Sequence, residues 1–485
     1  MLGDIIKKEI LDNLLSHKFL FIFILCSVLM LFSIYIGAAD YIESKKEYDA
    51  NVSALGERLQ PPETISIFSE YEGYRIFRQP QVLRTVVAGV EDAAGRVSYP
   101  NQLYENNLME SRHESNTIFT LFGSLDLMFA VKFILSLCAL FLTYDAVSGE
   151  KEKGTLKLTL SGSVSRARLI SGKIIGNYVS MLLLFLTPLI MSLIVLLLFP
   201  GISLSGGDWR RLISIFVMFL LYVSVFFALG IFISAVTARA STSFLVLLFL
   251  WIALVIVIPG ISVVVAKHIR PIPSSSSLSG QKSLFWLETN QAVSAEYNVK
   301  MNEVIPKIMQ RQTELQPLAK EDPKRYQEEM SKATAELGKL QEGRLLEITD
   351  RVTANNNQLD RDYQLKKDAQ QSLAKNISRI SPAASLTFGA MTLARTGMDD
   401  YDRFVAATRT YRPTYRKWMS AIISNPMQSG QIDENVVASI PQLPFVPERT
   451  GELLMRTLPD FALMAAMMII LLTGSYFAFL RYDVR

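Results

Sequence analysis

Six long apolar runs dominate the pattern of hydrophobic and polar positions along the chain. Each run has about 20 residues or more, enough to cross a hydrocarbon core of roughly 30 Å as a helix. Helices of soluble proteins rarely stay apolar on every face for so long. A membrane β-barrel would instead need segments of about 10 residues with alternating polarity. The runs therefore predict six transmembrane helices, at Phe19–Ala39, Leu125–Tyr144, Gly176–Phe199, Leu212–Val236, Phe244–Ala266 and Phe461–Leu480.

The first 18 residues have the pattern of an amphipathic helix. Its charged residues lie largely on one face, and one broad opposite face collects Leu2, Ile5, Ile6, Ile10, Leu14 and Leu15. Such a helix lies along a membrane surface, so we expect residues 1–18 to form a cytoplasmic interfacial helix. The alternative is a cleaved signal peptide ending at Gly37-Ala38-Ala39. It is disfavoured because the apolar run exceeds the usual signal core of about 7–15 residues.

The first long polar segment, residues 40–124, is expected to be a small mixed α/β domain. Its stretch Val82–Tyr99 resembles a β-hairpin with Gly95 at the turn.

The second polar segment, residues 267–460, opens with a Pro/Ser-rich linker and then becomes helical in pattern. Apolar residues recur at three- to five-residue steps among charges, which is typical of an amphipathic helix. Pro317 and Pro323 predict a break before that helix, and Asn355–Asn357 predict a bend after it. We therefore expect a long antiparallel helical hairpin.

The distribution of Lys and Arg near the membrane ends predicts the orientation, because these residues collect on the cytoplasmic side. With the N-terminus inside, the inner segments hold twelve of them: Lys7, Lys8, Lys18, Lys151, Lys153, Lys157, Arg166, Arg168, Lys173, Arg239, Arg481 and Arg485. Arg210 and Arg211 in a short outer loop are a minor contrary signal. Both termini are thus predicted to be cytoplasmic. The inner segments are 1–18, 145–175, 237–243 and 481–485, and the outer ones are 40–124, 200–211 and 267–460.

Composition excludes several classes of protein. The two cysteines, Cys26 and Cys138, both fall in apolar runs, which argues against a disulfide framework or a cysteine zinc cluster. The three histidines are far apart, so no metal site is predicted. A net charge of +4 is too small and too dispersed to indicate nucleic-acid binding.

Motifs of catalytic chemistry are missing from the sequence. The phosphate-binding loop G-x-x-x-x-G-K-[ST] does not occur, and the nearest match, at Gly172-Lys173, lacks the first glycine and the final Ser or Thr. Leu204–Gly207 begins like an ATPase signature, but it lies in a short outer loop and is read as coincidence. H-E-x-x-H and G-x-S-x-G are absent as well. We expect a chain that is not an enzyme and binds no cofactor itself.

Few ionisable residues lie near the predicted spans. Asp126, Lys132 and Asp460 lie toward the outer ends of the second and sixth spans and mark a candidate outer-leaflet polar site. Lys132 is the deepest, and its ammonium is expected either to extend outward or to pair with Asp460. A structural pair and a contact to substrate both remain open.

The cytoplasmic link between the second and third spans carries the most information. Charged Glu150–Lys153 is followed by Gly154, which is placed to end a helix. Thr155 can then begin a short element, Leu156–Leu160, whose alternation suits either a helix or a strand. Ser165 can cap the third span. We expect an apolar knob of Leu156, Leu158 and Leu160 on a charged collar, a shape suited to a socket on a partner protein.

At Glu150–Leu156 this link reads E-x-E-x-G-T-L, and V-S-R at Val164–Arg166 and Gly172-Lys173 follow it. These motifs, between spans two and three of six, resemble the coupling segment of ABC type-2 exporter permeases. The long insertion before the last span, with Ser381-Pro382 and an Arg/Tyr-rich helix, is similar to a subgroup with large extracytoplasmic domains. The motifs cover about 30 residues and the layout covers the whole chain.

The resemblance implies a homodimer or close heterodimer in the plasma membrane, such as the bacterial inner membrane, seated on two ATPase subunits that bind ATP and Mg. The coupling residues that it implies are Glu150, Glu152, Gly154, Thr155, Leu156 and Arg166.

Three functions are weighed: an exporter permease, a membrane-anchored scaffold that passes ATPase movement to outer partners, and an ion-coupled carrier. The nearly charge-free spans disfavour the carrier. Lipids, peptides, glycans and hydrophobic toxins all remain candidate substrates. Pro188 and Pro259-Gly260 are expected to kink spans three and five, as hinges or as packing adjustments.

Overall fold

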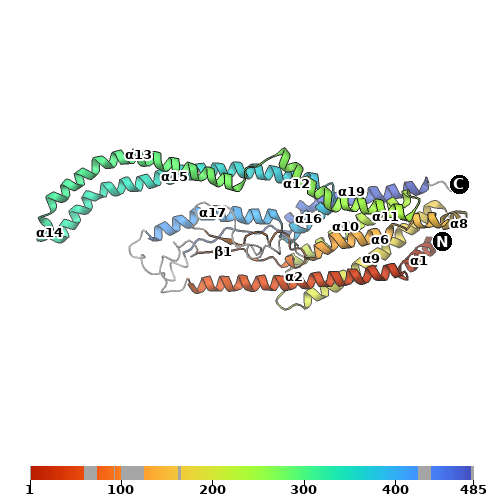
Figure 1. Cartoon of the computed structure of the whole chain (residues 1–485). Coiled ribbons are helices and arrows are strands. Elements are labelled where there is room, and N and C mark those ends of the chain that lie inside the picture. Colours follow the sequence, from red (N-terminus) through yellow and green to blue (C-terminus); the bar gives the residue numbers. More distant parts are fainter. Residues whose placement is uncertain are drawn as a thin grey trace. The chain divides into compact units, whose positions relative to one another are not determined.

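The structure, a computed structural model, describes residues 2–58, 74–91, 93–99, 125–161, 165–423 and 439–481. Almost all of its regular structure is helical (Figure 1). The elements are α1 (Leu2–Leu14), α2 (His17–Arg58), β1 (Ile76–Phe77), η1 (Val82–Thr85), β2 (Val97–Ser98), α5 (Leu127–Phe129), η2 (Ala130–Leu135), α6 (Ser136–Thr143), α7 (Ser148–Lys153), α8 (Thr155–Ser161), α9 (Arg166–Leu198), α10 (Gly206–Val236), α11 (Ala240–Ile252), η3 (Ala253–Val257), α12 (Ile258–Ile269), α13 (Ser275–Leu315), α14 (Leu318–Glu321), α15 (Pro323–Ser378), α16 (Pro382–Ala394), α17 (Met398–Ile423) and α19 (Thr450–Leu480).

Six helical segments within the described residues are long and apolar enough to cross a membrane. Each of the six predicted runs corresponds to one of them, which confirms the prediction of a helical polytopic fold with six spans. The segments are His17–Leu55, Leu127–Lys153, Arg166–Leu198, Gly206–Val236, Ala240–Ile269 and Thr450–Leu480.

Two of these spans contain a π-helical stretch. The first is η2, in the second span, and the second is η3, which lies just before Pro259 in the fifth. The fifth span is therefore locally widened just before Pro259, and the kink predicted at Pro259-Gly260 stays a prediction. Pro188 lies buried inside a continuous α9. The stretch at η2 has no proline or glycine to signal it.

The chain divides into two compact units, residues 1–261 with 377–485, and residues 262–376. The first unit is built around α10, two-thirds of whose apolar window is buried. It packs against α19, α6 and α16 (Figure 1). Large rings such as Phe219, Phe226 and Phe227 fill the core. Gly230 is needed here, because a Cβ at this position would lie 1.8 Å from Thr143 Oγ1.

The predicted hairpin at Val82–Tyr99 is wrong. The short strand β2 pairs instead with β1, with Phe77 opposite Val97, and Val82–Thr85 forms the 3₁₀ helix η1. The chain turns at Gly89, which has a φ of +64° and lies against the Thr396 carbonyl. The apolar residues Leu83, Val86 and Val87 are all fully buried. Their sequence pattern therefore reflects burial on every side rather than the two faces of a strand. The rest of the predicted α/β domain lies largely outside the described residues.

Buried ion pairs hold this region of the first unit together. Arg84 is buried between Asp40 of α2 and Glu91, whose Oε2 lies 3.6 Å from Arg84 Nε. Arg78 pairs with Asp400 of α17 at 3.0 Å. These contacts join three stretches that are far apart in sequence, so the charges here serve the fold.

A cluster of aromatic rings lies beside these pairs on the Arg/Tyr-rich helix α17. Tyr74 stacks on Tyr415 with ring centroids 5.0 Å apart, and Tyr411 donates a hydrogen bond to the Pro441 carbonyl at 2.7 Å. Burial raises the pKa of both Tyr411 and Tyr415 above the usual value. Both phenols therefore stay neutral and add packing rather than charge.

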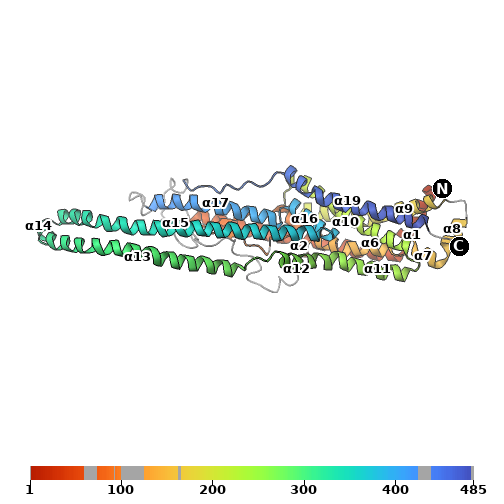
Figure 2. The same ribbon diagram turned by 90° about the horizontal axis from the view of Figure 1, so that it is seen from above.

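The second unit is an antiparallel helical hairpin of α13 and α15, joined through α14 (Figures 1 and 2). An ion pair joins Lys282 to Asp360 at 2.6 Å, and a second joins Arg311 to Glu329 at 3.5 Å. Arg311 comes after Lys282 in α13, but its partner Glu329 comes before Asp360 in α15. The two helices therefore run in opposite directions. This confirms the predicted hairpin.

An apolar seam of Val293, Ile348 and Val352 lies between the two ion pairs of the hairpin. The predicted break at Pro317 and Pro323 is present. At Asn355–Asn357, where a bend was predicted, α15 continues without a break in its helical structure.

Candidate functional site

The coupling segment, residues 145–175, forms a sharp bend of two short helices that we call the elbow: α7, Gly154 and α8. Gly154 has a φ of +74°, a left-handed conformation that side chains disfavour. It therefore ends α7 as the sequence predicted, and α8 is a helix rather than a strand. Ser165 occupies the position before α9 without a side-chain hydrogen bond.

Lys173 of the third span connects the elbow to the N-terminal helix. Its ammonium lies 2.7 Å from Glu150 Oε1 of α7 and 2.9 Å from Glu9 Oε1 of α1. Lys173 is only 2% exposed, so this ammonium depends on the two carboxylates in place of water. Glu150, predicted as a coupling residue, is thus an internal bridge between α7 and α9.

Two glycines of α9 let α1 approach closely. A Cβ at Gly172 would lie 2.6 Å from Ile5 Cγ2, and a Cβ at Gly176 would lie 2.6 Å from Glu9 Cβ. Asn13 also donates to Asn177 Oδ1 at 2.9 Å. The broad apolar face of α1 is therefore divided: part of it packs on α9.

The other apolar residues of α1 point away from that contact. Leu11, Leu14 and Leu15 are exposed, and Leu15 is the most exposed of the three. Of these, Leu14 and Leu15, which follows the end of α1, belong to the predicted apolar face, and contact of this face with a membrane surface stays a prediction.

The helix α7 is also bonded to the facing ends of the fourth and fifth spans. Lys151 donates to the carbonyls of Ala235 and Thr237, the latter at 3.0 Å. Glu152, the second predicted coupling glutamate, accepts a hydrogen bond from Ala240 N at 3.0 Å. A carboxylate at this position also suits the first turn of α11, where backbone N–H groups lack helical partners.

Contacts to the first and sixth spans complete this arrangement. Asp145 pairs with Lys18 at the start of α2, at 2.8 Å. Arg166 donates to the Leu480 carbonyl at the end of α19, at 3.1 Å. Residues 145–173 thereby contact the first, fourth, fifth and sixth spans, while Lys173 itself belongs to the third.

The predicted apolar knob is only partly correct. Leu156 points inward and is fully buried with Leu169, Ile170 and Phe479. Leu158 points outward and is 74% exposed. The side chain of Leu160 lies outside the described residues. Among the described side chains of the elbow, the exposed surface holds one leucine, Leu158, among polar and basic residues, Lys153, Thr155, Lys157 and Thr159.

The predicted outer polar residues do not form one site. Asp126 accepts hydrogen bonds from Ala88 N at 2.8 Å and Phe129 N at 2.7 Å. Asp460 pairs with Arg379 at 2.8 Å, so the expected alternative of a pair with Lys132 is not formed. Nothing in the local sequence marks Arg379 as this partner, because it precedes Asp460 by 81 residues. Lys132 is left apart from both.

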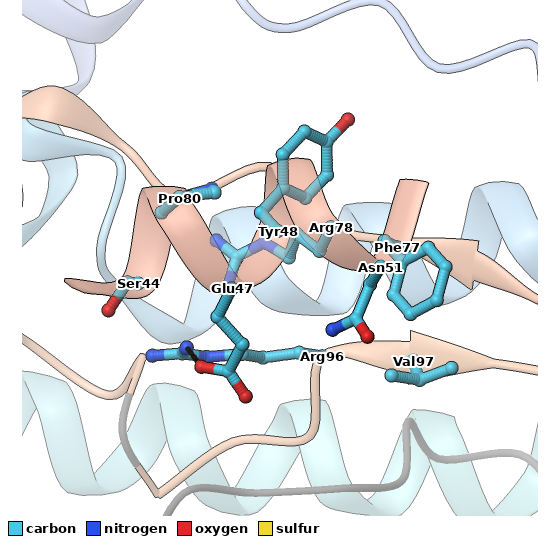
Figure 3. Close-up of a pocket in the computed structure, with 9 residues that line it drawn as sticks. All are labelled: Ser44, Glu47, Tyr48, Asn51, Phe77, Arg78, Pro80, Arg96 and Val97. Atoms are coloured by element: carbon cyan, nitrogen blue, oxygen red, sulfur yellow. Dashed lines mark ion pairs between the residues drawn. The ribbon is translucent and has the colours of Figure 1, made fainter. Parts of the chain in front are cut away.

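A small surface pocket lies beside α2, β1 and β2 (Figure 3). Its walls include Tyr48, Asn51 and Phe77, and Glu47 pairs with Arg96 across it at 3.7 Å. Among the described residues no group of three or more His, Cys, Asp or Glu side chains is placed to hold a metal ion. The contacts that join the most spans are those of residues 145–173.

Comparison with protein families places the whole chain in one of them. The description of that family is ABC-2 family transporter protein, and the match covers residues 4–484. No individual curated protein matches the sequence significantly. The match spans both polar segments as well as all six spans.

Proposed function

Because the chain belongs to the ABC-2 family of transporter proteins, we propose that it is the permease subunit of an ABC exporter. A separate ATPase subunit, present in two copies, binds ATP and Mg and hydrolyses the nucleotide. Two permease chains form the membrane part, with both termini in the cytoplasm. Its cargo is an amphiphilic molecule, because predominantly apolar spans suit a substrate that is itself partly apolar.

One observation carries this proposal: α7, together with Asp145 before it and Arg166 after it, is bonded to the first, third, fourth, fifth and sixth spans. A partner that presses on exposed Leu158 and Lys157 moves α7 through the bend at Gly154. Movement of α7 displaces Lys173, and with it both α9 and α1. Binding of ATP shifts the spans between two arrangements only by as much as its affinity differs between them.

Site-directed labelling tests the orientation. The two native cysteines are buried, so Leu158→Cys introduces one exposed thiol. We expect a membrane-impermeant maleimide to label it only from the cytoplasmic side, and the partner ATPase to block labelling. Labelling from the outer side would contradict the proposal.

Purification tests the partner. The chain alone is expected to have no ATPase activity, and to co-purify from native membranes with an ATPase whose activity it stimulates. If no nucleotide-binding protein co-purifies with the chain, or if the one that does is not bound at the elbow, the proposed permease function is wrong.

The separate second unit supports one other candidate, a scaffold that passes ATPase movement to outer partners. Residues 298–342 form the tip of the hairpin, and Gly343 lies against Tyr297 at its base. Replacing this tip with a short Gly/Ser turn keeps the base paired. A scaffold should then lose all function, whereas a permease should keep ATPase stimulation by its cargo.

A further inference from the structure

The widened stretch η2 of the second span is held in place by the fourth span. A π-helical turn breaks the usual hydrogen-bond pattern, and such turns are frequent at functional sites. At its centre, the Lys132 carbonyl accepts hydrogen bonds from Tyr222 OH and Ser136 Oγ, both at 2.7 Å. These bonds satisfy the backbone and fix the position from which the Lys132 side chain projects.

The Lys132 ammonium has no hydrogen bond or ion pair to any residue that the structure describes. Asp126 attracts it electrostatically but uses both carboxylate oxygens on backbone N–H groups, of Ala88 and Phe129. Asp460 is occupied by Arg379. A lysine in a membrane span is costly unless it finds an acceptor. The acceptor must therefore come from outside the described part of the chain.

One aromatic ring, Phe133, lies beside this ammonium and packs against two further rings. The ammonium lies 5.2 Å from the centroid of the Phe133 ring, which contacts Phe129 at 4.7 Å. Phe133 also meets Trp251 of the fifth span edge-on at 6.5 Å, and Trp251 Nε1 donates to Ser136 Oγ at 2.8 Å. A cation against aromatic faces is attracted to them but keeps its remaining donors free.

The fifth span exposes apolar side chains directly after Trp251 in the sequence. Only 11% of its apolar window is buried, less than in any other span. After Trp251 it exposes Ile252, Ile256 and Val257. A cation with no acceptor among the described residues, an adjacent aromatic ring and exposed aliphatic side chains together suit a molecule with an anionic head and an apolar tail.

We propose that Lys132 binds the anionic headgroup, phosphate or carboxylate, of an amphiphile that enters from the bilayer beside Trp251. The inference rests on the proposed function only in naming this amphiphile as candidate cargo. Binding itself requires no ATPase.

Fluorescence of Trp251 reports on this site without any partner protein. Replacing the other three tryptophans with phenylalanine (Trp209→Phe, Trp286→Phe and Trp418→Phe) leaves Trp251 as the only one. This chain is placed in phosphatidylcholine nanodiscs. Increasing fractions of either phosphatidylglycerol or phosphatidylcholine, brominated near the headgroup end of the acyl chain, are then added as quenchers.

We expect half-quenching at an about tenfold lower fraction of the anionic lipid, equal to ~1.4 kcal/mol. Lys132→Gln should abolish the preference and Lys132→Arg should keep it. Lys267→Gln, which removes an exposed lysine from the fifth span, the span of Trp251, should leave it unchanged. Equal quenching by the two lipids, or a preference that survives Lys132→Gln, overturns the proposal. Quenching of the chain that keeps Lys132 tests the proposal by itself. Equal quenching by the two lipids in that chain overturns the proposal even if the Lys132→Gln chain does not fold.

ATPase activity of the complex distinguishes the source of the headgroup. If phosphatidylglycerol stimulates the ATPase and Lys132→Gln removes the stimulation, the bound amphiphile behaves as cargo. If binding depends on Lys132 but the ATPase does not respond, the ligand is a resident lipid. Failure of the ATPase to associate at all would remove the permease function and leave the quenching result intact.

Discussion

Lys173 and Glu150 are 23 residues apart in sequence, and their charged groups meet at 2.7 Å in the buried space between the third span and the elbow. The same ammonium holds Glu9, so a single side chain connects three helices. Breaking one partner of such a buried group leaves a charge without compensation.

Lys173→Met should therefore be the most damaging single change at the elbow. It leaves Glu9 and Glu150 facing each other without their cation, and we expect the free energy of unfolding in a detergent titration to fall by ~3 kcal/mol. ATPase stimulation should be lost as well. Lys339→Gln, which removes an exposed lysine of α15 outside the elbow, is the control.

Removing all three charges at once distinguishes the effect of the ion pairs on ATPase coupling from their effect on stability. The triple variant Glu9→Gln, Glu150→Gln and Lys173→Met should regain part of the lost stability, because no unpaired charge stays buried. It should not regain ATPase stimulation. Normal stimulation in this variant would show that the bridge is not part of the coupling path.

The two described leucines of α8 should respond in opposite ways. Leu156→Ala empties a buried position and should lower the free energy of unfolding by ~2–4 kcal/mol. Leu158→Asp alters an exposed position and should leave stability unchanged, but it should prevent binding of the ATPase. Co-purification with the ATPase and detergent unfolding of each variant measure the two effects. ATPase binding that survives Leu158→Asp would argue against docking at this surface.

Gly176→Ala tests whether α1 must lie against α9. The added methyl would lie 2.6 Å from Glu9 Cβ, so α1 must shift, and we expect a loss of ~1–3 kcal/mol. Trypsin should also cut faster after Lys7 and Lys8. Gly260→Ala is the control, because open space surrounds Gly260 in another apolar helix. Equal trypsin rates in the two variants would count against close packing of α1.

Gly154→Ala tests the bend itself. An alanine held at a φ of +74° should cost ~1–2 kcal/mol, so the elbow should open and ATPase stimulation should fall several-fold. Gly154→Asn should be milder, because asparagine tolerates this conformation better. Gly280→Ala, in the exposed helix α13, should have no effect on stimulation. A Gly154→Ala chain with full stimulation would show that the angle is unimportant.

The sequence predicted the spans and the helical hairpin well because both depend on patterns within one stretch of chain. A run of 20 apolar residues is recognisable without knowing its neighbours, and so is the seam that includes Ile348 and Val352. The Val82–Tyr99 hairpin failed because alternation cannot be told from burial on all sides. Leu156 and Leu158 were likewise both predicted to form the exposed knob, because the sequence of α8 does not show which of them faces the interior.

The candidate site was harder to predict because its contacts join distant residues. Glu150 and Glu152 were identified from the motif, but their partners Lys173 and Ala240 have no local signal that identifies them as such. The same holds for Asp460, whose partner is Arg379 rather than Lys132. A sequence shows which charges need partners, and only the packing of helices decides between them.

The first span is part of a helix that does not stop at the end of its apolar run. From His17 to Arg58, α2 is one helix of 42 residues, about 60 Å long. Lys18 at one end is fixed to Asp145, and Asp40 and Ser44 farther along hold Arg84. An uninterrupted helix has no joint that could absorb a twist. A rotation imposed at Lys18 should therefore reach Asp40, Ser44 and the Arg84 side chain that they hold, all within the first unit.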